Sequence, residues 1–552
     1  MRQGGPLRTA AVLLGLLAAV PAGAFVRLEG EYFFLVDIRK QDRSFVWDFD
    51  SNNSDTFNLM QFRLFAQPLA GVEAFMKYEA EWNSGSNNNR RPVFQFRESH
   101  LRYRREFQGW GLDSYLFSRQ DRFWVNNHLI RVVDGGASGD GGNAQGARVD
   151  WWGLGGTTAT FITSDFSSQS NPGTGSLPNK PVPTDDAYIF RLRRDFLAGK
   201  LRTGLTWNQK NLAAGPALVS DDAAQVDSAG NVTGRVTLPD PILLSDKTTV
   251  YALDFRYSWN NTDYLLEYSV GRQAFLLSDA TREFLGLPED DGDGWDLSEF
   301  SLKHPQNWLP DDAVVRTEIR PLRVGNSRTG YFNVAPQAWY LGPLYRNALG
   351  DGNNDETGYF IDSWYLVPAR AITWTNRYVS YVKRVNQQRH VTEFFSELYV
   401  EFVNGFTGKL FYRDRATRDW RTDRDITVKT VTENDDVFAE MQVENKLAWL
   451  RLQFRIRDLE TLFQKELASI ETSVNISNPL KFYGRFTFGN DPARSRKGLF
   501  GELQWRPRNN LEVFLAYGPF WIGAGSNPVF EGNLEGSADN QDLLRLIVKG
   551  TF

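Results

Sequence analysis

The chain is dominated by segments of about ten residues in which apolar and polar side chains alternate. The first of them carries Val26, Leu28, Tyr32, Phe34, Val36 and Ile38 on one face. Its other face carries Arg27, Glu29, Glu31, Asp37 and Arg39. A period of two is typical of a β-strand with one apolar face. Soluble sandwiches and membrane barrels both contain such strands, so the alternation predicts an all-β fold without choosing between them.

The lengths of the connections favour the barrel. Short connections follow every second segment: Pro68 to Gly71, Gln108 to Gly111, Gly153 to Gly156, Leu197 to Gly199, Asn260 to Asp263, Pro368 to Arg370, Val403 to Thr407, Lys446 to Trp449, Ser477 to Pro479 and Pro507 to Asn510. The intervening connections are mostly longer and include 121–146, 166–185, 210–246, 273–357 and 519–541. Short turns at one end and long loops at the other predict a transmembrane antiparallel up-and-down β-barrel, with short periplasmic turns and long extracellular loops. Counting segments gives about 22 strands, or roughly 18–20 if some belong to folded loops.

The two ends of the chain agree with export to a bacterial outer membrane. Arg2 and Arg8 precede an apolar run over 10–20, and small residues over 21–24 follow, which predicts a signal peptide at 1–24. We therefore expect one barrel domain over 25–552, surrounded by lipid and lipopolysaccharide. Its first strand would begin at Phe25 and pair with the last, leaving no residues for an N-terminal plug. Phe552 ends that last strand with an aromatic side chain, which resembles the insertion signal read by the barrel-assembly machinery.

Composition excludes several kinds of chemistry. The chain has no cysteine and four histidines, which excludes disulfides, thiolate metal sites, iron–sulfur clusters and covalently attached c-type haem. The histidines are scattered and no Ser/His/Asp grouping stands out, so we expect no enzyme activity. Removal of Arg2 and Arg8 leaves a net charge of about −7, so nucleic acid is not an expected partner.

The alternation also predicts which charged side chains meet across hairpins on the face turned away from lipid. With Asn445 opposite Leu450, and by the same construction elsewhere, the predicted pairs are Glu444 with Arg451, Glu440 with Arg455, Glu397 with Arg413, Glu401 with Lys409, Arg256 with Glu267, and Glu471 with Arg485. These residues, together with Arg457 and with Arg191 and Arg193 on another strand, are candidates for lining a pore. Ladders of charge in a pore discriminate solutes by sign. The alternative is that each arginine only pairs with a neighbouring carboxylate.

One acidic loop resembles a calcium site. Asp351, Asn353 and Asp355 place oxygen ligands at alternate positions and Asp362 stands at the twelfth, but Glu356 occupies the place where an EF-hand loop needs glycine. Loop-bound Ca²⁺ is one interpretation and a solvated acidic loop is the other. We expect no other cofactor.

A stretch near the N-terminus resembles alginate-export-type porins. It comprises Arg97-Glu-Ser-His-Leu-Arg-Tyr103 on a strand, followed by Ser118-Arg-Gln-Asp-Arg122-Phe-Trp-Val before an early loop. That family carries an Arg-Glu strand and a Gly-Arg-Gln motif at these places, and Ser118 replaces the glycine. The resemblance covers roughly 94–135. It implies a plugless barrel of about 18 strands with an arginine-lined passage for an anionic polysaccharide. The acidic charge and the larger number of segments keep that substrate from being carried over.

Together these features predict passive or facilitated passage of polar or charged solutes through the barrel. A wide barrel is usually obstructed, and 273–357 is the one connection that we expect to be long enough to fold inward and narrow the lumen. Two other functions remain open: a sheath or scaffold for a periplasmic or secreted partner, such as an electron-transfer conduit, and a surface receptor built from the long loops.

Overall fold

The computed structural model describes most of the chain after residue 24. The described residues are 25–41, 44–46, 56–83, 93–118, 120, 125, 129–133, 144–153, 155–167, 184–211, 216–226, 232–276, 280, 312–347, 349, 355–368, 371–383, 389–423, 426–459, 461–490, 495–518, 529 and 543–552. The predicted signal peptide at 1–24 lies outside them. Within this part of the chain, no helix combines the length and the apolar character needed to cross a bilayer.

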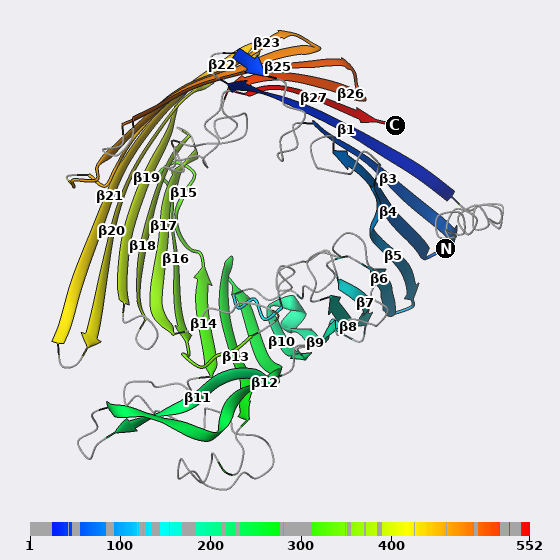
Figure 1. Cartoon of the computed structure of the whole chain (residues 1–552), viewed down its shortest axis with the longest axis vertical. Helices are drawn as coiled ribbons and strands as arrows, with labels where there is room; N and C mark the ends of the chain where they lie inside the picture. The colour runs from blue at the N-terminus through cyan, green and yellow to red at the C-terminus, as the bar shows by residue number, and fades with distance from the viewer. Residues whose placement is uncertain are drawn as a thin grey trace.

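The described strands form one antiparallel sheet that closes into a ring (Figure 1). In chain order the first strands are β1 (Phe25–Gln41), β2 (Ser44–Val46), β3 (Thr56–Leu69), β4 (Val72–Asn83), β5 (Val93–Phe107), β6 (Trp110–Ser118), β7 (Ala144–Gly153), β8 (Thr157–Ser167) and β9 (Thr184–Phe196). After the 3-10 turn η1 (Leu197–Gly199) come β10 (Leu201–Asn211), β11 (Ala217–Val226), β12 (Val232–Trp259), β13 (Thr262–Leu276), β14 (Ala313–Arg320), β15 (Leu322–Asn326), β16 (Gly330–Leu341), β17 (Glu356–Val367) and β18 (Ile372–Lys383). The last are β19 (Arg389–Val403), β20 (Phe406–Asp423), β21 (Ile426–Glu444), β22 (Ala448–Arg457), β23 (Lys465–Ser477), β24 (Leu480–Asn490), β25 (Ser495–Arg508), β26 (Leu511–Gly518) and β27 (Leu543–Thr551).

With β14 and its continuation β15 counted as one strand, and with β2 and β11 left out, the ring has 24 described strands, two more than the main prediction from sequence. The ten short turns predicted from sequence each separate neighbouring strands of the ring. The two extra strands lie in 273–357, where β14 and its continuation β15 form a hairpin with β16. Treating 273–357 as one loop was therefore wrong. Pro321 separates β14 from β15, and a proline interrupts the regular strand pattern because it donates no ladder hydrogen bond.

The ring closes between its first and last strands, as the sequence predicted. β1 pairs with β27 from Glu31 opposite Thr551 to Arg39 opposite Leu543. The backbones of Gly30 and Phe552 then exchange two hydrogen bonds, of 2.8 and 2.9 Å. The Phe552 ring lies over Gly30, where an added Cβ would come within 2.1 Å of it. The aromatic side chain of the last residue is thus part of the seam; its role as an insertion signal stays a prediction.

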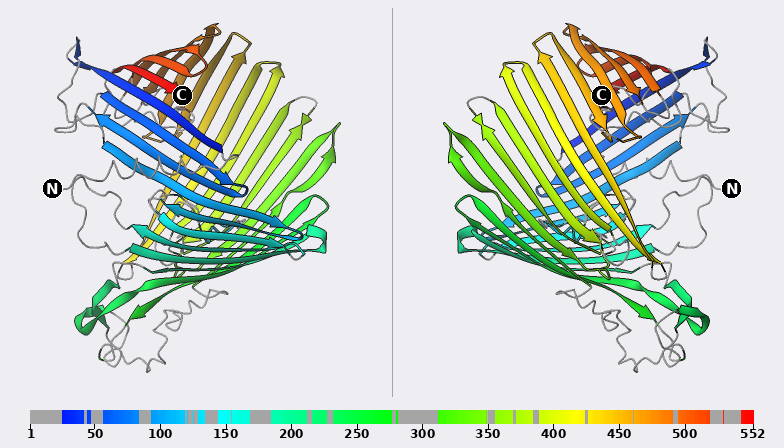
Figure 2. Two further views of the ribbon diagram at one scale, coloured as in Figure 1. Left: turned by 90° about the vertical axis from the view of Figure 1, so that its right-hand side faces the viewer. Right: turned by 90° about the vertical axis from the view of Figure 1, so that its left-hand side faces the viewer.

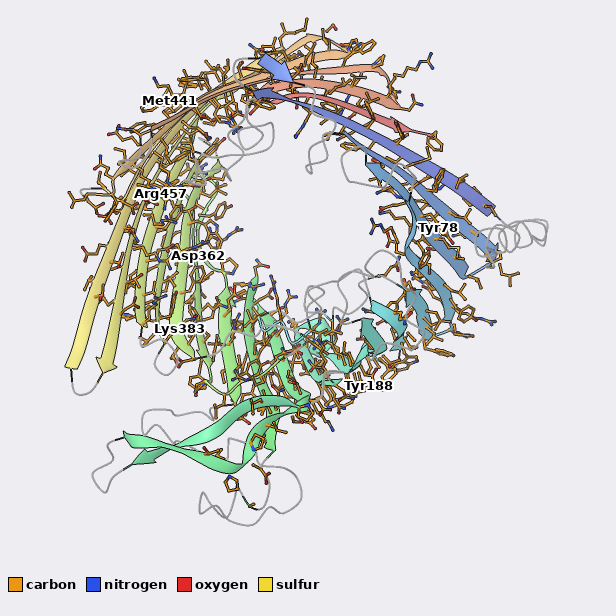
Figure 3. The ribbon with its side chains drawn as sticks, viewed as in Figure 1. Tyr78, Tyr188, Asp362, Lys383, Met441 and Arg457 are labelled. Carbon is orange, nitrogen blue, oxygen red and sulfur yellow. The ribbon has the colours of Figure 1, made fainter. Side chains whose placement is uncertain are left out.

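The outer face of the ring is apolar. Large hydrophobic side chains that alternate along the strands remain exposed, including Leu28, Leu116, Tyr251, Met441 and Ile470. Met441 lies on the outer side of the wall, whereas Asp362 lies on the side of the lumen (Figure 3). The strands are tilted relative to the axis of the barrel, as closure of the sheet requires (Figure 2). A β-structure that spans a lipid bilayer needs an apolar outer face toward the lipid. It also needs a closed sheet, because a closed ring leaves no unpaired strand edge in the bilayer.

One hairpin extends beyond the ring. β11 pairs only with the first part of β12, from Ala217 opposite Leu244 to Val226 opposite Val232. This ribbon lies outside the ring in both projections (Figures 1 and 2). The connection 210–246 is therefore not a simple loop, since it contains β11 and the beginning of β12.

Candidate functional site: the lumenal wall

The inner face of β22 to β24 carries a buried network of charged and polar side chains around Glu471. The Glu471 carboxylate accepts hydrogen bonds from Arg485 at 2.8 Å and from the Tyr483 hydroxyl at 2.7 Å. Arg451 approaches its second oxygen to 3.5 Å. Arg485 is directly opposite Glu471 in the ladder, which confirms that predicted pair.

A second buried group lies farther from the short turns, on β20 to β22. Asp436 is 1% exposed and accepts hydrogen bonds from Arg413 and, at 2.6 Å, from Arg455. Arg455 is 4% exposed, so the charge of this arginine is satisfied mainly by protein. Arg457 lies two residues further along the same face of β22. These arginines are lumenal, as predicted, but two of them hold one carboxylate that the sequence analysis did not select.

The predicted opposition of Glu444 and Arg451 was wrong by two residues. The ladder places Glu444 opposite Trp449, Gln442 opposite Arg451 and Glu440 opposite Gln453. Asn445 causes the difference, because its side chain accepts hydrogen bonds from the backbones of Leu447 and Ala448 and closes a tighter turn. Moving a turn by one residue moves the pairing by two, which keeps every side chain on its predicted face.

The same two-residue shift affects three more predicted pairs, which are Glu397 with Arg413, Glu401 with Lys409, and Glu440 with Arg455. Glu397 lies opposite Phe411, Glu401 opposite Thr407, Arg413 opposite Phe395, and Arg455 opposite Phe438. The Lys409 ammonium group is 2.9 Å from the carboxylate of Glu397, which lies diagonally across the ladder. Lys409 therefore pairs with Glu397 and not with the predicted partner, Glu401. Between Glu401 and Val403 the register is irregular, which indicates a β-bulge next to the turn.

Arg256 and Glu267 do not pair either. Asn260 and Asn261 form a two-residue turn with φ values of +49° and +61°, which is the backbone of a type I′ hairpin. Arg256 consequently binds Asp263 at 2.6 Å, and Asp254 stands opposite Glu267.

Arg191 forms an ion pair that crosses an intervening strand. Its guanidinium on β9 is 2.8 Å from Asp254 on β12, with β10 between them. Gly204 of β10 makes this possible, because a Cβ there would come within 2.1 Å of the Asp254 carboxylate. Arg193, the second arginine predicted on this strand, lies opposite Gly204 in the ladder.

A short segment of the connection after β6 lies against the inner wall; we call residues 129–133 strap 1. Both Glu267 oxygens accept hydrogen bonds from it, at 2.9 Å from the Leu129 amide and 2.5 Å from the Ile130 amide. Arg316 donates to the Leu129 carbonyl at 3.0 Å, and Asn208 donates to the Val132 carbonyl at 2.9 Å. Glu267 therefore binds a loop backbone, which sequence analysis did not predict.

The connection after β16 forms a second segment on this wall, residues 342–347, which we call strap 2. The Arg346 amide donates to the Gly271 carbonyl at 3.2 Å. The Tyr345 and Ser269 hydroxyls are 3.1 Å apart. Asn347 joins the two straps, since its side-chain amide donates to the carbonyl of Val132 at 3.1 Å. Strap 2 lies within the predicted 273–357 region, but strap 1 does not, so 273–357 is not the one connection that reaches the inner wall.

The straps bury an apolar cluster inside the barrel. Its buried members are Phe117, Val125, Ile130, Val132, Val133, Ile162, Ala187, Ile189, Val250, Ala252, Val314, Leu341, Tyr345 and Leu349. Val529, from the connection after β26, forms a similar contact with Phe411, Phe438 and Leu467 on the other side of the ring. The sequence does contain a signal for these contacts: Ala187 to Phe190 and Val250 to Leu253 are unbroken apolar runs, which are typical of strands buried on both faces.

Part of the predicted calcium loop can be placed. Asp355 is 5% exposed and precedes β17, whereas Asp362 lies within β17 and forms an ion pair with Arg377 at 3.1 Å. Asp351 and Asn353 lie outside the described residues. In the described ranges, no three His, Asp or Glu side chains form a group that could hold a metal ion.

The stretch that resembles alginate-export-type porins, roughly 94–135, covers nearly all of β5, all of β6 and all of strap 1. Gln120, from its Ser-Arg-Gln motif, is 8% exposed and donates to Glu98 at 2.9 Å. This bond holds the beginning of the connection against the inner wall. The ring is larger than that family's barrel of about 18 strands.

Comparison with known proteins finds solved structures whose similarity to this chain is low, both in sequence and in backbone geometry. No family model matches the chain, and no curated protein matches it. Among solved structures, the siderophore receptor PirA from Pseudomonas aeruginosa has a TM-score of 0.42 and 6% identity, over 95% of this chain and 80% of that one. The P pilus usher PapC translocation pore has a TM-score of 0.38 and 8% identity, over 96% and 99%. The FrpB iron transporter from Neisseria meningitidis has a TM-score of 0.37 and 10% identity, over 98% and 83%.

Similarity at this level carries no conclusion about solute or mechanism, and the class of the protein follows from its own geometry. A closed antiparallel ring with an apolar outer face and a charged inner face is the architecture of bacterial outer-membrane proteins. The chain is a β-barrel of the bacterial outer membrane.

Proposed function

We propose that this barrel is a passage for polar or charged solutes across the outer membrane, by passive or facilitated diffusion. The observation that supports this proposal is that charged side chains line the inner wall. Half-buried lumenal side chains such as Arg413, Arg451 and Lys409 expose between 22% and 31% of their side-chain surface. Charged groups that line a water-filled lumen favour polar solutes and discriminate among them by sign.

The straps support a narrowed passage rather than a bare ring. A ring of this width tends to be obstructed in its lumen. Strap 1 and strap 2 both lie on the wall between β6 and β16, where they add a second layer inside the barrel. In this proposal the solute passes between this double-layered wall and the arginine-containing wall of β20 to β24.

Single-channel recording in planar lipid bilayers tests the proposal. Purified, refolded protein should give stepwise conductance in symmetric KCl, with heat-modifiable gel mobility as the control for correct folding. Folded protein that inserts into vesicles but never raises the current above the lipid background would contradict it.

The predicted selectivity residues have their own test. If Arg451 and Arg455 contribute to selection, the double substitution Arg451→Ala/Arg455→Ala should reduce an anion preference measured as a reversal potential across a KCl gradient. The buried contact of Arg455 with Asp436 gives this residue a structural role as well. An unchanged reversal potential would assign both arginines to structural pairing.

The breadth of the ring favours one alternative, a sheath for a periplasmic or secreted partner. A ring of 24 strands is wide enough to enclose more than a small solute. Purification from native membranes with a stoichiometric partner, together with negligible conductance of that complex, would support the sheath and contradict the open passage.

A further inference from the structure

A cavity of about 490 Å³ lies at the end of the barrel that carries the short turns. The turn after β21, the turn after β23 and the end of β25 border it. Its described lining includes the cations Lys446, Lys481 and Arg506 and no carboxylate, so we call it the basic cavity. Its volume lies within the range of about 300–1,000 Å³ that is common for small-molecule sites.

One side of the basic cavity is a row of three side chains on adjacent strands. Lys481 of β24 lies opposite Asn475 of β23 and opposite Gln504 of β25. Lys481 is two residues before Tyr483, whose hydroxyl binds Glu471 on the inner wall. Because side chains alternate between the two faces of a strand, Lys481 and its two neighbours in the row are on the inner face.

Lys446 comes from the neighbouring turn and lies beside this row. The Asn475 side-chain amide donates to the Lys446 carbonyl at 3.4 Å, and the Asn475 backbone amide donates to the Leu447 carbonyl at 2.7 Å. Asn475 is therefore the one residue between the backbones of Lys446 and Lys481. This arrangement explains why both lysines border the same cavity.

The two lysines carry the net charge of the basic cavity. Arg506 is 2.6 Å from the Glu512 carboxylate, so the charge of this arginine is compensated. Within the described part of the chain neither lysine forms an ion pair, although Glu502 on β25 is close enough to attract Lys481. Two ammonium groups at one cavity favour an anion there through their summed field.

The adjacent cavity has the opposite character. It has a volume of about 740 Å³ and is bordered by Glu401, Glu440 and Glu444. Lys446 borders both cavities and marks the boundary between them. An anion at this mouth of the barrel is therefore repelled on one side of Lys446 and attracted on the other.

We propose that the basic cavity is a binding site for oxyanions, and that Lys446 and Lys481 hold a carboxylate or phosphate group of a solute at the periplasmic mouth. An ammonium group offers three donors on a flexible stem, which suits oxyanions of different shapes. The inference deepens the proposed passage and rests on it for the route by which the solute arrives. Binding itself can be measured without any conductance.

Titration calorimetry of the refolded protein in detergent, with inorganic pyrophosphate at low ionic strength, provides the first test. The double variant Lys446→Gln/Lys481→Gln should bind pyrophosphate about tenfold more weakly than wild type. The matched control is Lys200→Gln/Arg328→Gln, which removes two exposed cations from other short turns at the same end of the barrel. The control changes the net charge equally and should bind like wild type.

Three results of this titration would overturn the inference: no binding by wild type, equal binding by the lysine variant and wild type, or equal weakening in the control. The last result would assign the binding to the net charge of the whole rim. Heat-modifiable gel mobility shows that each variant is folded.

Block of single-channel current provides the second test. Pyrophosphate added on the side of the short turns should block wild type at a lower concentration than pyrophosphate added on the other side, and the lysine variant should lose this asymmetry. Equal block from both sides of wild type would overturn the inference. Lysine-dependent binding without any conductance would overturn the proposed passage and leave the binding site in place.

Discussion

The wall from β6 to β16 and the wall from β20 to β24 differ in what covers their lumenal positions. The first carries Ile162, Ile189, Val250 and Val314 on its inner face and covers them with two straps. The second carries Asp436 and Glu471, with arginines from neighbouring strands around them. Apolar lumenal residues occur on this second wall where Val529 packs against them. At these two places, a segment from a connection covers apolar residues at lumenal positions of the wall.

The comparison also separates two kinds of buried carboxylate. Asp436 neutralises arginines of its own wall, whereas Glu267 accepts hydrogen bonds from the backbone of a loop. Loss of the first should weaken the barrel itself. Loss of the second should release strap 1 and leave the barrel closed.

The largest effect is expected for Asp436→Ala. Removing one partner from a buried charge group leaves Arg413 and Arg455 without their shared carboxylate, which costs about 3–5 kcal/mol. Urea unfolding in lipid vesicles, followed by loss of heat-modifiable gel mobility, measures it. Asp436→Asn retains an oxygen acceptor and should lose less stability than Asp436→Ala. Equal stability of Asp436→Ala and wild type would mean that this network does not stabilise the barrel.

The next effect is expected for Glu267→Ala. The amides of Leu129 and Ile130 lose their acceptors. Each amide that stays buried without a partner destabilises the bound position of strap 1 by about 1–3 kcal/mol. The consequence should be a detached strap 1, seen as higher single-channel conductance and protease cleavage near 129–133. Glu267→Gln serves as the matched control because it keeps one acceptor. Conductance and cleavage like those of wild type in Glu267→Ala would mean that strap 1 is held by its apolar contacts alone.

A smaller effect is expected for Gly271→Ala. The new methyl group would overlap the Arg346 carbonyl oxygen and approach the Tyr345 ring to 2.8 Å, at a cost of about 1–3 kcal/mol. Strap 2 should move and the conductance should rise. Gly501→Ala on β25 is the control, since the nearest atom to its Cβ is 3.9 Å away. A rise of the same size in both variants would contradict a specific fit at Gly271.

The smallest effect is expected for the half-exposed pair of Lys409 and Glu397. Their side chains are 22% and 23% exposed, and pairs with access to water contribute about 0–1 kcal/mol. A double-mutant cycle with Lys409→Ala and Glu397→Ala, measured by urea unfolding, gives the coupling energy. A value near that expected for Asp436 would mean that exposure does not distinguish these lumenal pairs.

The candidate site could be predicted in part. Alternation placed Arg413, Arg451 and Arg455 on the inner face, because the period of two assigns faces regardless of register. It could not identify Asp436 as the common partner of two arginines, since the register depends on the turns. Asn445 and Asn260 set those turns through local geometry, and each moved its hairpin by two residues.

The sequence by itself determined the class of fold, the inner and outer faces of the strands, the ten short turns and the pairing of the first strand with the last. These features depend on local periodicity and on chain order. The tertiary structure decided the number of strands in 273–357, the partners of the charged residues and the position of the straps. The reason is that Glu267 and Leu129, or Gly271 and Arg346, are far apart in the chain and meet only after the ring has closed. Their contacts depend on wall curvature and loop path, which alternation does not encode.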